Sequence, residues 1–242
     1  MKHNSRDFNA KNTDPERTPL NTEYCNEKIK DVYHELFDDA LQRYNDKQKR
    51  ADRKIENYYE KIRSGKQEKT FHEIIIQVGN CDNMNAKSLD GELAERILDE
   101  YYQDFQKRNP NLKVFSAHLH MDEATPHLHI DFVPFTTKSK RGLDTRVSLK
   151  QALANQGFVG NSKQETEWSL WVESEKEALS KVMERYGVEW EQKVFLQLQI
   201  VLHNLLIPYL VSLNYFYNIH LHYILFCLIS FFQMMNVYLY FL

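Results

Sequence analysis

Two runs of alternating apolar and polar residues flank a short loop, and they constrain the fold more than any other feature of the chain. The runs are Val114–His120 and His127–Phe135, and Met121–Pro126 separates them. Successive side chains of a strand point to opposite faces of a sheet, so the pattern predicts a β-hairpin with one apolar and one polar face. The apolar face is expected to carry Phe115, Leu119, Leu128, Ile130 and Phe132 toward a core.

The polar face of this hairpin is expected to carry four of the ten histidines: His118, His120, His127 and His129. Three neutral imidazoles that converge form a divalent-metal site with open coordination positions, which suits Lewis-acid catalysis. A single His-x-His pair on a strand is more often part of a solvated polar face. Two pairs around an Asp-Glu-x-Thr-Pro loop favour the metal site, because ligand type, facing and loop spacing agree.

Three motifs, in this order along the chain, resemble those of one enzyme family. Lys2–Arg6 resembles an N-terminal His-Asn-x-Arg motif, and Asn12–Asn21 resembles an Asn-Pro-x-Arg-x-x-Leu-Asn segment. His120–His129 reads His-x-Asp-Glu-x-Thr-Pro-His-x-His and resembles the metal motif of the Pre/Mob (MobV-type) plasmid mobilisation relaxases. The similarity runs from Lys2 to about Lys193, and three ordered motifs are far more specific than one.

The resemblance implies an HUH-type endonuclease that nicks one DNA strand at a plasmid origin of transfer and stays covalently attached to it. Such an enzyme serves plasmid mobilisation and recombination. Its expected partners are single-stranded or supercoiled plasmid DNA at that origin and the conjugative coupling machinery. His120, His127 and His129 would hold Mn²⁺ or Mg²⁺ against the scissile phosphate, where the ion would neutralise charge during in-line attack.

The resemblance also implies that His3 is the nucleophile, since a largely neutral imidazole can attack phosphorus near neutral pH. Tyr24 is the alternative nucleophile, because relaxases of other families use tyrosine. Glu123 would orient a metal-bound histidine or accept a proton, or it would only cap the loop. His118 does not occupy a position where the family places a metal ligand. We therefore expect it to contact either a metal-binding histidine or the DNA.

Contacts to DNA are expected from guanidinium and ammonium groups, which fit phosphate well. The net charge of −3 is unusual for a DNA enzyme, so the basic contribution would have to be local. Two segments are rich in Lys and Arg, residues 138–141 and Lys47–Lys54, and each is either a DNA contact or a solvated run. The DNA- or phosphate-binding residues expected are Arg6, Arg17, Asn21, Lys138, Lys140 and Arg141.

The order of predicted elements indicates an α+β fold, an antiparallel sheet backed by helices as in HUH-type relaxases. Residues 1–193 are expected to form one relaxase-like domain. Its parts are an extended motif arm at 1–23, a long charged helix within 24–66 (about Asn26 to Ile62), and a sheet core with C-terminal helices at 67–193. The remaining elements expected are a strand at 71–78, a helix at 88–108 capped by Ser88, and helices at 148–156 and 162–186.

The tail at 194–242 departs from the family pattern, because it contains no Asp, Glu, Lys or Arg. Val194–Leu213 and Tyr223–Leu242 are each long enough to span a bilayer, so one interpretation is a membrane hairpin. The interpretation we favour is a frameshift or read-through tail. The N-terminal residues are polar and show no signal peptide, and the three cysteines have neither metal-binding nor redox spacing. Both observations indicate that the body of the protein is cytoplasmic.

The N-terminus departs from the family pattern too. Family members usually carry a strand ahead of the His-Asn-x-Arg motif, whereas this chain starts two residues before His3. Loss of that strand would leave an unpaired sheet edge beside the site, so activity is expected to suffer. Two alternative functions therefore remain: an inactive DNA-binding remnant of the family, and a metallohydrolase unrelated to DNA.

Overall fold

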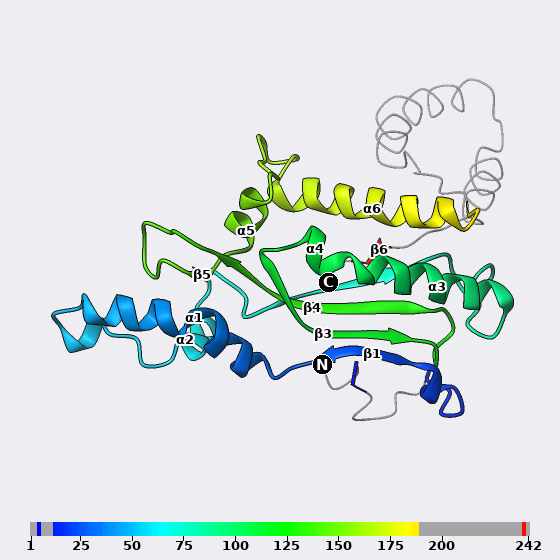
Figure 1. Cartoon of the computed structure of the whole chain (residues 1–242), viewed down its shortest axis with the longest axis horizontal. Helices are drawn as coiled ribbons and strands as arrows, with labels where there is room; N and C mark the ends of the chain where they lie inside the picture. Colours follow the sequence, from blue (N-terminus) through cyan, green and yellow to red (C-terminus); the bar gives the residue numbers. More distant parts are fainter. Residues whose placement is uncertain (1–3, 6–11, 189–238, 241–242) are drawn as a thin grey trace, which may run out of the picture.

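The computed structural model describes residues 4–5, 12–188 and 239–240 (Figure 1). Its centre is an antiparallel sheet with the strand order β1-β3-β4-β2-β6, and β5 pairs with the end of β4. The strands are β1 (Thr22–Asn26), β2 (His72–Gln77), β3 (Leu112–His120), β4 (His127–Thr136), β5 (Arg146–Val147) and β6 (Leu239–Tyr240). The predicted antiparallel sheet backed by helices is confirmed.

The β3–β4 hairpin pairs His118 with His129 and His120 with His127, as the alternation predicts. A bulge between Val114 and Ser116 adds one residue to β3. Side chains that precede the bulge therefore point to the face opposite to the one that simple alternation predicts. Phe115 was predicted on the apolar face, and that prediction is wrong because the bulge turns its side chain to the histidine face. The other four predicted core residues lie in the main core.

One face of the sheet is covered by four helices. Their apolar faces bury the main core, which includes Ile97, Tyr101 and Trp171. Ser88 caps the first of them as predicted, because its hydroxyl accepts the backbone N–H of Gly91 at 3.1 Å. The helices are α3 (Leu89–Gln103), α4 (Phe105–Arg108), α5 (Leu149–Asn155) and α6 (Glu167–Arg185).

On the opposite face, α1 (Ile29–Asp46) and α2 (Tyr58–Ser64) pack with Phe115 and Val133. The predicted single helix from Asn26 to Ile62 is wrong. The Asn45 side chain accepts the N–H of Ile55 and donates to its carbonyl, at 2.9 and 2.8 Å, and so folds the chain back after α1. The last residues of the predicted arm at 1–23 belong to a strand, β1, which was not predicted.

None of the helices in the described ranges is both long and apolar enough to cross a bilayer. Most of the tail at 194–242 lies outside those ranges, so its interpretation stays a prediction, as does the domain boundary after residue 193. The exception is β6, which pairs with Ile75 and Ile76 at the outer edge of β2.

Candidate metal centre

Three histidine rings gather on the sheet face opposite the main core, the face on which α1 and α2 also pack. His120 ends β3, while His127 and His129 begin β4, and all three are buried. The ring centroids lie 5.3 Å apart for His120 and His127, 5.2 Å for His120 and His129, and 5.1 Å for His127 and His129. Imidazole nitrogens lie about 2.1 Å from a bound metal, so rings that share one ion have centroids about 5 Å apart.

Among the described residues, no group of three or more His, Cys, Asp or Glu side chains has the geometry to hold a metal ion as it stands. The ring centroids are close enough for the three rings to share an ion. Their nitrogens would have to shift to bind it. Two further contacts decide whether those nitrogens can accept a metal.

Those contacts fix the tautomers of His127 and His129. Nδ1 of His127 lies 2.9 Å from the carbonyl oxygen of Thr125, and Nδ1 of His129 lies 2.7 Å from Oε1 of Glu73. The hydrogen bond from His129 lowers the pKa of Glu73 to about 2, so this carboxylate is ionised and only accepts. Both Nδ1 atoms therefore donate, and in each neutral ring Nε2 keeps its lone pair for a metal.

Glu73 was not predicted as a site residue, yet it joins two motifs. Asn4 is buried and donates Nδ2 to Oε1 of Glu73 at 2.9 Å and to Oδ2 of Asp131 at 3.4 Å. Burial and the neighbouring Glu73 raise the pKa of Asp131 to about 6. Asn4 thus ties the His-Asn-x-Arg motif to the histidine group. The clue in the sequence was a carboxylate directly before the three isoleucines of β2.

The other two histidines of the hairpin, His120 and His118, lie near carboxylates. Nδ1 of His120 lies 3.9 Å from Oδ1 of the buried Asp122. His118 stacks parallel to His120, with ring centroids 6.2 Å apart, and its Nδ1 lies 3.8 Å from Oε2 of Glu23 on β1. His118 therefore lies beside the three proposed ligands, on the side toward β1.

The Asn12–Asn21 segment holds the loop that follows His120. Arg17 donates Nε to the carbonyl of Met121 at 2.9 Å, and Oδ1 of Asn21 accepts the N–H of Met121 at 2.7 Å. Arg17 also donates to the carbonyl of Ala86. These bonds give Arg17 and Asn21 a structural role, while their expected phosphate contacts stay predictions. Two more hydrogen bonds come from the same segment. The N–H of Asp14 donates to the carbonyl of Asp122 at 2.7 Å, and the Thr18 hydroxyl donates to Oδ2 of Asp122 at 3.1 Å.

Glu123 lies at the edge of the histidine group. Its Oε1 is 4.0 Å from Nε2 of His127, which is too long for a hydrogen bond, and its Oε2 accepts Nδ2 of Asn12 at 2.7 Å. The Thr125 carbonyl therefore orients His127 through Nδ1, while the expected role of Glu123 stays a prediction. The carboxylate lies beside the nitrogen expected to face a metal, where it could act on a proton.

Tyr24 lies on the other face of the sheet. It packs against the main core, its ring stacks on Tyr102 with centroids 4.1 Å apart, and its hydroxyl donates to Oδ1 of Asp99 at 2.8 Å. Burial and Asp99 raise the pKa of this hydroxyl well above its usual value. The prediction of Tyr24 as the alternative nucleophile is wrong, because the sheet separates it from the histidines.

The other expected site residues lie elsewhere. His3 and Arg6 fall outside the described residues, so their roles stay predictions. Lys138, Lys140 and Arg141 are exposed in the loop that follows β4. Since β4 begins at His127 and ends at Thr136, a rise of about 3.3 Å per residue puts this loop about 30 Å from the histidines.

Residues 1–165 match the family model described as "Plasmid recombination enzyme". No curated protein matches. Among solved structures, the chain is similar to the MobM relaxase domain (MOBV) in Mn-bound crystals with plasmid pMV158 oriT DNA. The pH 5.5 form is 24% identical over 80% of this chain and 81% of that one, with a TM-score of 0.46. The pH 6.8 form, with a 3′-thiophosphate, is 25% identical over 78% and 80%, with a TM-score of 0.42.

Proposed function

We propose that this chain, since it belongs to the plasmid recombination enzyme family, is a metal-dependent relaxase. It would nick one strand of plasmid DNA at an origin of transfer and remain attached to the cut strand, for mobilisation or recombination of the plasmid. The observation that supports this best is the group of three buried histidines in which two Nδ1 atoms donate to fixed acceptors.

His120, His127 and His129 would hold the ion, Mn²⁺ or Mg²⁺. When bound, it would supply Lewis-acid stabilisation of the negative charge that develops on the phosphate oxygens. The protein's own contribution is orientation. Glu73 and the Thr125 carbonyl fix two of the rings, and residues 12–21 hold the loop between the strands.

His3 is proposed as the nucleophile because it precedes Asn4, which is anchored to Glu73 and Asp131. Its ring nitrogen would form a bond to phosphorus while the bond from phosphorus to the 3′-oxygen breaks. The product is a phosphoramidate at the 5′ end of the cut strand and a free 3′-hydroxyl. Glu123 would accept the proton that the imidazole loses, and the released 3′-oxygen would take a proton from water to become the hydroxyl.

The test is a covalent-adduct assay on the full chain with Mn²⁺ and the supercoiled plasmid that carries its gene. A relaxase yields nicked plasmid and a protein–DNA band that survives denaturation, and both disappear with a chelator and in His129→Ala. Mn²⁺ binding with neither nicking nor DNA binding would instead favour a metallohydrolase unrelated to DNA. DNA binding without nicking, in protein that still binds Mn²⁺, would identify an inactive remnant.

Removing the Glu73 carboxylate is expected to weaken metal binding. Glu73→Ala should lower Mn²⁺ affinity by about 10–100-fold, because His129 loses the acceptor that fixes its tautomer. Glu73→Gln should lose less, since its amide oxygen still accepts. Titration of Mn²⁺ followed by electron paramagnetic resonance measures this, with the exposed Glu165→Gln as a matched control. Wild-type affinity in folded Glu73→Ala would refute the role of Glu73.

A further inference from the structure

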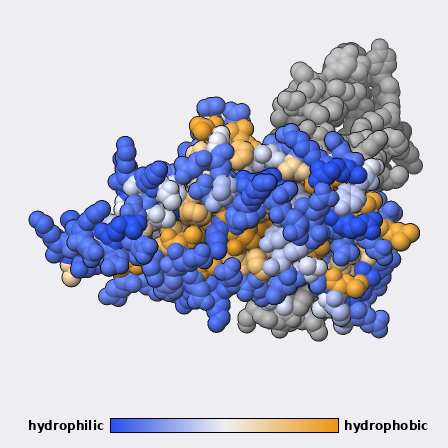
Figure 2. Space-filling view, viewed as in Figure 1, coloured by the Kyte–Doolittle hydropathy of each residue, from blue (hydrophilic) through white to orange (hydrophobic). Residues whose placement is uncertain are grey.

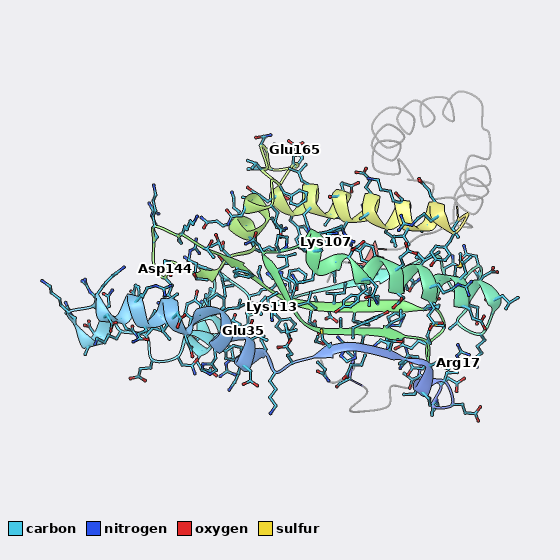
Figure 3. All side chains as sticks on the ribbon, viewed as in Figure 1. Arg17, Glu35, Lys107, Lys113, Asp144 and Glu165 are labelled. Carbon is cyan, nitrogen blue, oxygen red and sulfur yellow. The ribbon has the colours of Figure 1, made fainter. Side chains whose placement is uncertain are left out.

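Two basic segments far apart in the sequence meet at the end of the sheet opposite the histidines. Residues 43–54 and 138–146 together contain ten Lys and Arg and three Asp, a net charge of +7 in a chain whose total is −3. Arg43 on α1 donates Nε and Nη2 to the two carboxylate oxygens of Asp144, both at 2.8 Å, and so joins the segments. Figure 3 shows Asp144 beside α1, and this end of the molecule is almost entirely hydrophilic in Figure 2.

Most of these positive charges form no salt bridge with another described residue of the protein. Arg43, Arg50 and Arg146 pair with Asp144, Asp52 and Glu68. The other seven are exposed and form no salt bridge within the described ranges. They are Lys47, Lys49, Arg53, Lys54, Lys138, Lys140 and Arg141. Like charges gathered in one place repel one another, so a polyanionic partner would relieve a cost that the free protein carries.

The two loops that present these charges are held by specific hydrogen bonds. Asn45 bonds both backbone groups of Ile55 and so closes the loop between α1 and α2. In the other loop, the N–H of Ser139 donates to the carbonyl of Asp144, and Arg146 donates Nε to the Ser139 hydroxyl, both at 2.9 Å. The basic side chains therefore project from fixed backbones, which lowers the entropy cost of binding.

The chemistry of this surface favours the phosphate backbone of a duplex. None of the exposed residues in the two described segments is aromatic, and Tyr44 packs inward against the apolar residues that α1 and α2 share with Phe115 and Val133. Single-strand binding relies on bases stacked on aromatic rings, whereas duplex binding draws on Lys and Arg at phosphates. The surface lies about 30 Å from the histidines along β4, which corresponds to about 9 base pairs of duplex.

We propose that this basic end binds the phosphate backbone of duplex DNA about one helical turn from the nick. The proposal rests on the proposed function in taking DNA as the partner, but it requires neither metal nor cleavage. Binding can therefore be measured with a chelator present, so that failure to nick and failure of this surface are separate results.

The experiment measures fluorescence anisotropy of the full chain with a labelled duplex of mixed sequence, about 20 base pairs or two helical turns long. A single strand of the same length is the second probe, and each titration is repeated over a range of salt concentrations. Two variants carry three changes each at the basic end, and one control carries three elsewhere. They are Lys49→Gln/Arg53→Gln/Lys54→Gln, Lys138→Gln/Lys140→Gln/Arg141→Gln, and the control Lys107→Gln/Lys163→Gln/Lys181→Gln on the helical side.

Each basic-end variant is expected to lower duplex affinity about tenfold or more and to reduce the salt slope by about 1 for each phosphate that is no longer neutralised. The control should bind as the wild type does, and all three should melt at the wild-type temperature. Equal losses of affinity in the control and the basic-end variants would reduce the effect to net charge and overturn the proposal. A larger loss for the single strand than for the duplex would also overturn it.

Discussion

Replacing His3 with alanine is expected to abolish the covalent protein–DNA adduct while leaving metal binding intact. The adduct requires a nucleophilic nitrogen, and alanine offers none. Among the proposed ligands, His127 and His129 keep the acceptors that orient them, Thr125 and Glu73, so Mn²⁺ affinity should not change. A denaturing gel of the reaction measures the adduct, and titration with Mn²⁺ measures the affinity.

Tyr24→Phe is the matched control for this experiment. It removes a hydroxyl that donates to Asp99 on the helix-covered face, so the adduct should form as in the wild type. The expected cost is only about 1 kcal/mol of stability from the missing hydrogen bond. An adduct that persists in His3→Ala and disappears in Tyr24→Phe would reverse the assignment of the nucleophile.

The second large effect is expected at Glu175, a buried carboxylate on α6. Its Oε2 accepts the Tyr101 hydroxyl and, at 2.9 Å, Nη2 of Arg108, while its Oε1 accepts Nδ2 of Asn109 at 2.9 Å. Asn109 in turn accepts Nε1 of Trp171 at 2.6 Å. This network joins α6 to α3 and α4, the helices that cover the core face of the sheet.

Glu175→Ala should lower the free energy of unfolding by about 3–5 kcal/mol, because Arg108 and Asn109 would lose their partner in a buried site. Urea denaturation of the full chain measures this value. Glu177→Ala removes an exposed carboxylate from the same helix, where it pairs with Lys181 at the surface, and should leave stability nearly unchanged. Similar unfolding curves for the two variants would contradict a stabilising role of the network.

Local patterns predicted the hairpin correctly. The alternation of β3 and β4 gave the facing of His118, His120, His127 and His129, because side-chain direction in a strand depends only on position along it. The cap at Ser88 was also predictable, since its hydrogen bond reaches only three residues along the chain. The prediction for Phe115 failed because a bulge adds one residue without leaving a trace in the apolar pattern.

Contacts between distant residues were not predictable. The break after α1 depends on Asn45 finding Ile55, and the facing of Tyr24 depends on how β1 joins β3. Glu73 gained its role from His129, which lies 56 residues later in the chain. Arg17 was expected at a phosphate, yet it holds the carbonyl of Met121, 104 residues away.

The sequence alone determined the chemistry that is available: the family, the imidazole donors and the strands that carry them. These follow from residue types and short-range periodicity, which are local properties of the chain. Only the tertiary structure decided which groups act together. Glu73 beside His129, Asn4 beside Glu73, and Arg43 beside Asp144 are each set by how the sheet and helices pack. Such pairings depend on the positions of whole elements in space, which no pattern within one segment specifies.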